Sequence, residues 1–255
     1  MPRLFIEPDQ IQEQRVVISG DDAHYLRHVL RLAVGDSFEI VVPNGSECTV
    51  VIIKTEPESL VGEIIEKRAR NTEPTVRVTL YQAMLKGKNF PLVIEKAVEL
   101  GVAAIVPLRT HRTVIRLSGH RAAQRQRHWQ KIARQAAQQS ERMTLPSVRE
   151  PIDFSQALSE WQSNGSPGIL FSARAAVDAD CSLRRVLKEL GSSRHLSIFI
   201  GPEGGFTAQE AESAITAGLR EVNLGPRIMR AETAAIAACA ICMYELEQLD
   251  PVDVK

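Results

Sequence analysis

The chain has 255 residues, of which 44% are hydrophobic and 24% charged, and its formal net charge is zero. This is the composition of a globular protein with a sizeable core, and a zero net charge alone gives no reason to expect a nucleic-acid partner. No apolar run approaches the roughly 20 residues that span a bilayer. The opening stretch MPRLFIEPDQ has no signal-peptide core, and four cysteines do not form a disulfide framework in a chain of this length. We therefore expect a cytoplasmic protein with no membrane partner.

The first part of the chain has β character. Short segments rich in β-branched residues, separated by Gly, Asn and Pro, predict strands at VVISG, SFEIVVP and CTVVIIKT. One helix interrupts them at DDAHYLRHVLRL (21–32), with Leu26, Val29 and Leu30 as its buried stripe. These elements predict a small β-barrel-like domain over residues 1–72, and the polar stretch 66–74 is its predicted linker.

The predicted helix carries two pairs of side chains at i,i+4 spacing. Arg27 and Arg31 would share one helix face, an arrangement that suits contacts with neighbouring phosphates of RNA. His24 and His28 have the same spacing, but no third ligand lies nearby, so they do not predict a zinc site. We expect no metal in this protein.

After the linker, strands alternate with helices. The predicted strands are VRVTLYQAM, AAIVPLR, GILFS, LSIFI and EVNLG, and the helical patterns between them are NFPLVIEKAVELG, GHRAAQRQRHWQKIARQAAQQ, SLRRVLKELG and TAQEAESAITAG. Thr207 and Glu210 match a capping box, and Gly101, Gly191 and Gly218 stand where a helix is expected to end. This alternation predicts an α/β domain over residues 73–250, with a parallel sheet covered on both faces.

One segment of this domain is strongly basic. From Arg109 to Arg134 there are eight Lys or Arg residues and three histidines, without one Asp or Glu. Such a local field attracts an RNA backbone even when the net charge of the whole chain is zero. A solvated helix surface is the alternative interpretation of the same charge run.

Two further segments are built alike. IFIGPEGGFTAQE (198–210) and LGPRIMRAETAAIAACAICMY (224–244) each lead from a strand through Gly-Pro into a helix. Neither has the glycine spacing of a Walker loop or of a dinucleotide-binding turn. Loops at the carboxyl ends of neighbouring parallel strands form the ligand crevice of open α/β sheets, although two tight turns that simply pack well would look similar. Cys239 and Cys242, in the second segment, are interpreted as small buried residues.

Three motifs, IGPEGGFT, LGPRIMRAETAAIAA and WQKIARQAAQQSER, stand in this order behind a small β domain. In this respect the chain resembles the RsmE family, bacterial enzymes that methylate N3 of a uridine in 16S ribosomal RNA. The resemblance implies an amino-terminal PUA-like domain and a SPOUT-type α/β domain that carries a trefoil knot. It also implies S-adenosylmethionine as cofactor, 16S rRNA within the small ribosomal subunit as partner, and a homodimer formed through the carboxyl-terminal domain.

The resemblance places the cofactor among three loops at strand ends, and the predicted cofactor-binding residues are Leu170, Phe171, Ile200, Gly201, Gly204, Gly205, Leu224, Gly225, Ile228, Arg230, Thr233 and Ala234. Deprotonation of uridine N3 would be helped by a cation or a general base, which predicts catalytic roles for Arg230, Glu232 and Glu203. For Glu203 a structural role beside a helix terminus is equally open. The predicted RNA-binding residues are Arg27, Arg31, Lys86, Lys88, Arg112, Arg134, Ser140 and Arg142.

Three functional hypotheses follow. The first is an S-adenosylmethionine-dependent methyltransferase acting on uridine N3 of 16S rRNA. The second is another SPOUT enzyme that methylates a ribose 2′-hydroxyl or a different RNA. The third is a ribosome assembly factor that binds RNA without catalysis.

Overall fold

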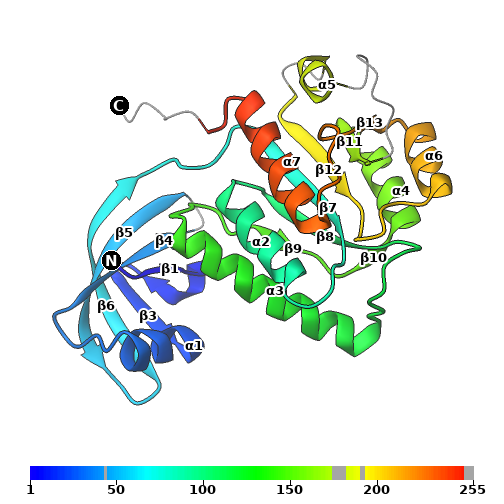
Figure 1. Ribbon diagram of the computed structural model, residues 1–255. Helices are drawn as coiled ribbons and strands as arrows, with labels where there is room; N and C mark the ends of the chain where they lie inside the picture. The colour runs from blue at the N-terminus through cyan, green and yellow to red at the C-terminus, as the bar shows by residue number, and fades with distance from the viewer. Residues whose placement is uncertain (43–44, 174–181, 190–192, 250–255) are drawn as a thin grey trace. The chain divides into compact units, whose positions relative to one another are not determined.

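The computed structural model describes residues 1–42, 45–173, 182–189 and 193–249 (Figure 1). The chain forms two compact units, and each is described here by itself. The first consists of Met1–Glu73 together with Ala137–Leu145, and the second of Pro74–Ala136 together with the chain from Pro146. Within the described ranges, no helix has the length and apolarity needed to cross a membrane.

The first unit is built on a mixed six-stranded sheet in the order β1-β4-β5-β6-β3-β2. Its strands are β1 (Arg3–Phe5), β2 (Ile11–Gln12), β3 (Arg15–Ser19), β4 (Ser37–Val42), β5 (Ser46–Thr55) and β6 (Ser59–Ala69). β1 pairs with β4 in parallel, and the other pairs are antiparallel. Alternate residues of β3 are buried, as expected for a sheet with one face against a core. The predicted linker 66–74 begins too early, because β6 continues to Ala69.

The helical segment of this unit differs from the predicted helix. It consists of α1 (Gly20–His24) followed by a π-helical turn, η2 (Tyr25–Val29); a short 3-10 turn, η1 (Pro8–Gln10), precedes β2. The wider turn leaves Leu26 buried but exposes Val29, so the predicted buried stripe is wrong at that position. Arg31 lies past the helix with φ of 59°, so it does not share a helix face with Arg27. The guanidinium of Arg27 donates to the carbonyls of Glu56 and Pro57.

A buried polar cluster ties the segment 137–145 to the rest of the first unit. Arg3 forms an ion pair of 2.6 Å with Glu47, and both side chains are almost fully buried. The same guanidinium donates to the carbonyl of Arg142. Arg142, itself 4% exposed, pairs with Glu73 at 2.5 Å, and Glu73 also accepts the backbone N–H of Met143. Charges removed from water are tolerated when they are paired and hydrogen-bonded in this way.

The second unit contains a seven-stranded sheet in which every pair is parallel. The order is β10-β8-β7-β12-β11-β13, and β9 also pairs with β8. The strands are β7 (Arg77–Ala83), β8 (Ala104–Arg109), β9 (Ser147–Val148), β10 (Ile152–Asp153), β11 (Gly168–Phe171), β12 (His195–Ile200) and β13 (Arg220–Val222). The predicted parallel α/β architecture is confirmed, although β9 and β10 had no counterpart in the prediction.

Six helices of the described residues accompany this sheet: α2 (Asn89–Glu99), α3 (Gly119–Gln139), α4 (Phe154–Asn164), α5 (Leu183–Glu189), α6 (Ala208–Thr216) and α7 (Ala231–Glu245). α4 and α6 cover one face through an aromatic cluster in which Tyr81 stacks on Phe199 with ring centroids 4.2 Å apart. α7 packs against α2 and β12 (Figure 1). Gly101 and Gly218 have positive φ and end α2 and α6 as predicted, whereas Gly191 lies outside the described residues.

The small residues of α7 allow this close packing. Ala235, Ala238, Cys239 and Cys242 have no exposed surface, which confirms the interpretation of the two cysteines as buried. Burial raises the pKa of the Cys239 thiol to about 12, so it remains protonated and unreactive at neutral pH. Among the described residues, no group of three or more potential metal ligands comes together.

The buried cluster of the first unit yields a stability prediction. Replacing Glu73 by alanine removes the partner of a buried guanidinium and the acceptor of two backbone N–H groups, those of Met143 and Thr144. We expect the free energy of unfolding of the first unit to fall by about 3 kcal/mol, measured by urea denaturation. The matched control is Glu63→Ala, at an exposed position of β6. This substitution should change the free energy of unfolding by less than about 0.5 kcal/mol. Similar effects of both substitutions would contradict a stabilising role of the cluster.

Candidate functional site

The carboxyl ends of four strands meet at one edge of the second unit. Parallel pairing aligns Gln82 of β7 with Ile200 of β12, Ile200 with Phe171 of β11, and Phe171 with Val222 of β13. The chain therefore leaves all four strands at the same level. Open parallel sheets bind ligands at this edge, where loops diverge beyond the strands.

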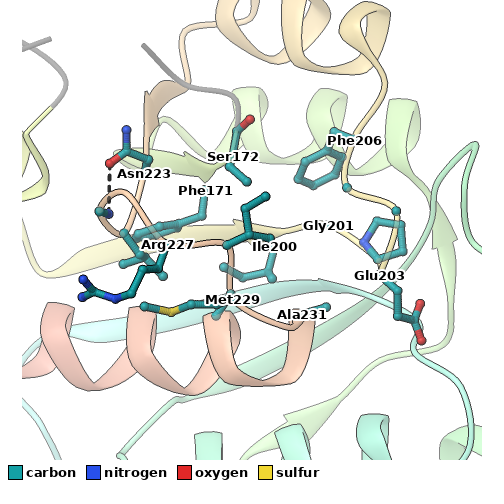
Figure 2. Close-up of a pocket in the computed structure, with 18 of the residues that line it drawn as sticks. Phe171, Ser172, Ile200, Gly201, Glu203, Phe206, Asn223, Arg227, Met229 and Ala231 are labelled. Atoms are coloured by element: carbon teal, nitrogen blue, oxygen red, sulfur yellow. Dashed lines mark hydrogen bonds between the residues drawn. The ribbon is translucent and has the colours of Figure 1, made fainter. Parts of the chain in front are cut away.

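A pocket of about 230 Å³ lies among three of these loops (Figure 2). Its wall is formed by residues 171–173 after β11, residues 200–206 after β12, and residues 223–229 after β13, with Ala231 and Ala234 of α7. Most of the wall consists of apolar side chains and glycine backbone, and its polar side chains are Ser172, Glu203, Asn223 and Arg227. Such a lining suits a flat heteroaromatic ring with polar edges.

Glycine is required in the loop after β12 for steric reasons. A Cβ on Gly201 would lie 3.1 Å from the backbone nitrogen of Phe206 and 3.2 Å from Cα of Gly205. Gly205 has φ of 66°, and its N–H donates to the carbonyl of Pro202 at 2.8 Å. The loop therefore folds back tightly on itself, and its backbone lines the pocket without side chains in the way.

Neighbouring loops hold this glycine loop in place. The carboxylate of Glu203 accepts the backbone N–H of Lys86 at 3.0 Å. Arg112 donates to the carbonyls of Gly204 at 2.7 Å and Phe206 at 3.3 Å. Both contacts connect the ends of β7 and β8 to the pocket wall, so the wall has its shape before any ligand arrives.

The start of α6 is fixed in a similar way. Thr207 accepts the N–H of Glu210, and the Glu210 side chain accepts the N–H of Thr207, which confirms the predicted capping box. The second oxygen of Glu210 accepts the backbone N–H of His111 at 2.7 Å. One carboxylate thus caps the helix and binds the loop after β8.

Most of the predicted cofactor-binding residues meet at the pocket. Those that line it are Phe171, Ile200, Gly201, Gly204, Gly205, Leu224, Gly225, Ile228 and Ala234. Leu170 does not line it: this side chain is fully buried in the aromatic cluster, because successive residues of a strand face opposite sides of the sheet. Arg230 and Thr233 also lie outside the pocket wall, at the amino end of α7.

The structure adds residues to the predicted cofactor-binding set. Ser172, Asn223, Arg227 and Met229 line the pocket, and Oδ1 of Asn223 accepts the N–H of Gly225 (Figure 2). Gln82 is fully buried beside the glycine loop and donates to the carbonyls of Ala83 and Gly201. The one available signal was position. Gln82, Ser172 and Asn223 are among the last three residues of predicted strands, and Arg227 closely follows one.

The predicted catalytic residues lie in two places. Arg230 is the exposed N-cap residue of α7, and Glu232, in the first turn of that helix, is partly buried. Glu203 is exposed and engaged with the backbone of Lys86, an arrangement in which it fixes a loop. Arg230 and Glu232 are therefore neighbours at one helix terminus, whereas Glu203 belongs to the loop after β12.

The predicted RNA-binding residues have very different surroundings. Lys86 and Lys88 are exposed after β7, whereas Arg134 and Ser140 are partly buried on and after α3. The guanidinium of Arg112 is bound to carbonyls of the glycine loop. Arg142 is buried in the polar cluster of the first unit. The last two cations are thus engaged within the protein.

The comparisons with known proteins agree with this geometry. Residues 71–243 match the family described as RNA methyltransferase domain, and residues 18–65 match the RNA methyltransferase PUA domain. The chain is 33% identical over 241 residues to ribosomal RNA small subunit methyltransferase E of Synechocystis, covering 93% of this chain and 76% of that protein. It is 29% identical over 252 residues to the protein of the same name from Bacillus subtilis, covering 98% of each.

Two solved structures extend the similarity to the fold. Ribosomal RNA small subunit methyltransferase E from Neisseria gonorrhoeae, bound to S-adenosyl methionine, superposes with a TM-score of 0.82 at 30% identity, covering 96% of this chain and 97% of that one. A putative methyltransferase from Legionella pneumophila in complex with the same cofactor has a TM-score of 0.85 at 25% identity and covers 95% and 96%. With its PUA-like domain followed by a SPOUT-type α/β domain, the chain belongs to the ribosomal RNA small subunit methyltransferase E (RsmE) family of RNA methyltransferases.

Proposed function

We propose that the protein transfers the methyl group of S-adenosylmethionine to N3 of a uridine in 16S rRNA. The observation that carries the proposal is the pocket at the carboxyl ends of β11, β12 and β13, closed by a glycine loop whose shape is fixed by Glu203 and Arg112. Its lining of glycine backbone and apolar side chains fits an adenosine group. Two structural relatives were solved with this cofactor.

The residues of the pocket divide by their chemistry. Backbone N–H and C=O groups of Gly201, Gly204 and Gly205 would bind the polar edge of the adenine, and Ile200 and Leu224 would pack on its faces. When bound, S-adenosylmethionine supplies an electrophilic methyl group on a positively charged sulfur. The task left to the protein is to bring a deprotonated uridine nitrogen to it.

Arg230 and Glu232 are placed to help with that deprotonation. The N3 imide proton of uridine is largely retained at neutral pH, and its loss spreads negative charge onto O2 and O4. Arg230 is an exposed cation at the amino end of the 15-residue helix α7, where the helix dipole also favours negative charge. Arg230 would stabilise the uridine anion, and Glu232 would orient Arg230 or accept the proton.

The acceptor RNA requires a larger surface than the pocket. We assign residues 1–72 as a PUA-like RNA-holding domain and residues 73–250 as the catalytic domain. Arg31 in the first, and Lys86, Lys88, Arg134 and Ser140 outside it, are the candidate RNA contacts. Arg27, like Arg112, already donates to backbone carbonyls and would have to exchange them for RNA phosphates. The substrate would be rRNA within the small ribosomal subunit in the cytoplasm, where that subunit is assembled.

A second copy of the chain would cover apolar side chains that the second unit exposes. Exposed apolar side chains occur on α7 and in the loop before it: Ile228 is 87% exposed, Tyr244 65% and Ile241 39%. Ile241 and Tyr244 are three residues apart and share one face of α7, and a contiguous exposed apolar patch marks a protein contact. We therefore propose a homodimer formed through α7 of the carboxyl-terminal domain.

The proposed methylation is tested on small ribosomal subunits that lack it. Subunits incubated with the protein and S-adenosylmethionine should show a new reverse-transcriptase stop at one uridine, because a methyl group on N3 blocks base pairing. Omission of the cofactor is the control. Methyl incorporation without a stop would instead support ribose methylation, and absence of incorporation into subunits and free rRNA would favour the assembly-factor hypothesis.

The role of Arg230 is tested by replacing it with alanine. We expect kcat to fall by about 100-fold, because one charge-stabilising donor is lost, while the Kd for S-adenosylmethionine changes by less than about twofold. Arg227→Ala is the comparison, since Arg227 lines the pocket and should affect Kd more than kcat. Isothermal titration and single-turnover methylation separate the two quantities. Equal losses in Kd and kcat for Arg230→Ala would make Arg230 a cofactor-binding residue.

A further inference from the structure

The rotation of α3 about its own axis is fixed by three side chains on its inner face. Trp129 is buried against Phe90 of α2, with ring centroids 4.5 Å apart. Gln126 donates to the carbonyl of Val148, and Gln130 donates to the carbonyl of Pro146 and accepts the N–H of Val148, all at 2.8 Å. Because these contacts pin one side of the helix, the residues on the other side face solvent.

Four basic residues occupy the solvent side. Arg121, Arg125, Arg127 and His128 are all exposed, and we call them the α3 basic face. Arg121, Arg125 and His128 follow i, i+4, i+7 spacing, and Arg127 lies on the adjacent row. Within the described part of the chain, none of the four side chains has a hydrogen bond or an ion pair.

The rest of the basic segment differs from this face. Arg109 is bound to Asp153 at 2.7 Å and to the carbonyl of Pro151. Arg112 is bound to the carbonyls of Gly204 and Phe206. Some cations of the segment therefore serve the fold, whereas those of the α3 basic face remain available to a partner outside the protein.

The chemistry of the face indicates which partner fits. Three arginines within about 9 Å of helix form a positive field that no acidic residue between Arg109 and Gln139 offsets. The only Trp, Tyr or Phe of the helix, Trp129, is buried, which leaves His128 as the one ring of the face on which a base could stack. A surface with three arginines and a single imidazole ring favours phosphates over bases.

We propose that the α3 basic face, none of whose residues lines the pocket, binds the phosphate backbone of the substrate RNA. This inference rests on the proposed function, because it takes RNA as the substrate. The face would supply affinity that is independent of sequence and strongly dependent on salt. The choice of the target uridine would be left to the pocket and its surroundings.

The test uses the full chain with the three substitutions R121Q, R125Q and R127Q combined. It measures how strongly RNA binding by this variant depends on salt. Glutamine keeps helix propensity and length while removing charge. The dissociation constant for a 16S rRNA transcript is measured between 50 and 200 mM KCl for this variant and the unchanged protein. A plot of the logarithm of the association constant against the logarithm of the KCl concentration has a negative slope. Loss of three arginine–phosphate contacts should reduce the magnitude of that slope by about 2 to 3. The Kd for S-adenosylmethionine, and kcat at saturating RNA and low salt, should stay within about twofold.

A matched control removes the same charge elsewhere in the second unit. Arg77 and Arg194, at the amino ends of β7 and β12, and Lys188 in the last turn of α5 are equally exposed. The variant R77Q/K188Q/R194Q should leave the slope unchanged. Equal slope changes in both variants would show a general charge effect and overturn the inference, as would an unchanged slope in the α3 variant.

The same experiment separates this inference from the proposed function. If the unchanged protein methylates rRNA while the α3 substitutions leave the salt slope intact, the inference fails alone. If the unchanged protein transfers no methyl group but the α3 substitutions reduce the slope, the proposed activity fails and the RNA-binding face stands. Thermal unfolding of both variants confirms that the substitutions leave the fold intact.

Discussion

The parallel pairing of β12 with both β7 and β11 is the interaction on which the rest of the site depends. It places Gln82, Ile200 and Phe171 in one row across the sheet, and the pairing of β11 with β13 adds Val222 to that row. Four loops therefore start at the same edge of the sheet, although their first residues are spread between positions 83 and 223 of the chain. A slip of one residue in any of these pairs would turn every side chain of the strand to the other face and move its loop out of line. The fully buried aromatic and aliphatic residues on both faces of β12 oppose such a slip.

The loops themselves are held by polar contacts that use few side chains. Glu203, Arg112 and Glu210 each bind backbone groups of another loop, so the pocket wall depends on carboxylate and guanidinium groups that need not touch a ligand. Charge-assisted hydrogen bonds to backbone are short and directional, which suits them to this use. A charged residue in a ligand-binding loop is thus not necessarily part of the chemistry. In this protein several such residues shape the space in which the chemistry would occur.

The elements predicted correctly from the sequence are those whose signal lies within a short stretch of chain. The bounds of α3, the capping box at Thr207 and the alternation of strands and helices all follow from periodicity or from side chains three or four residues apart. The two-residue strands β9 and β10 were not predicted, because they are too short to show a hydrophobic pattern. Leu170 was placed in the pocket because the sequence does not show which face of β11 it occupies. The basic segment was recognised, but which cations are bound internally depends on Asp153 and Gly204, residues far away in the chain.

The first unit is assembled from two pieces of chain. The buried guanidinium of Arg3 finds acceptors on Glu47 and on Arg142, which is 139 residues further along. During synthesis, the strands of residues 1–73 can pair early, but the last side of this unit is added when the segment 137–145 has been made. Pro74–Ala136 of the α/β unit are translated in between, and the rest of that unit follows. The amino-terminal unit can therefore begin to fold first but cannot be completed until Leu145 has been made, so its maturation is coupled to the progress of the ribosome through the first part of the other unit.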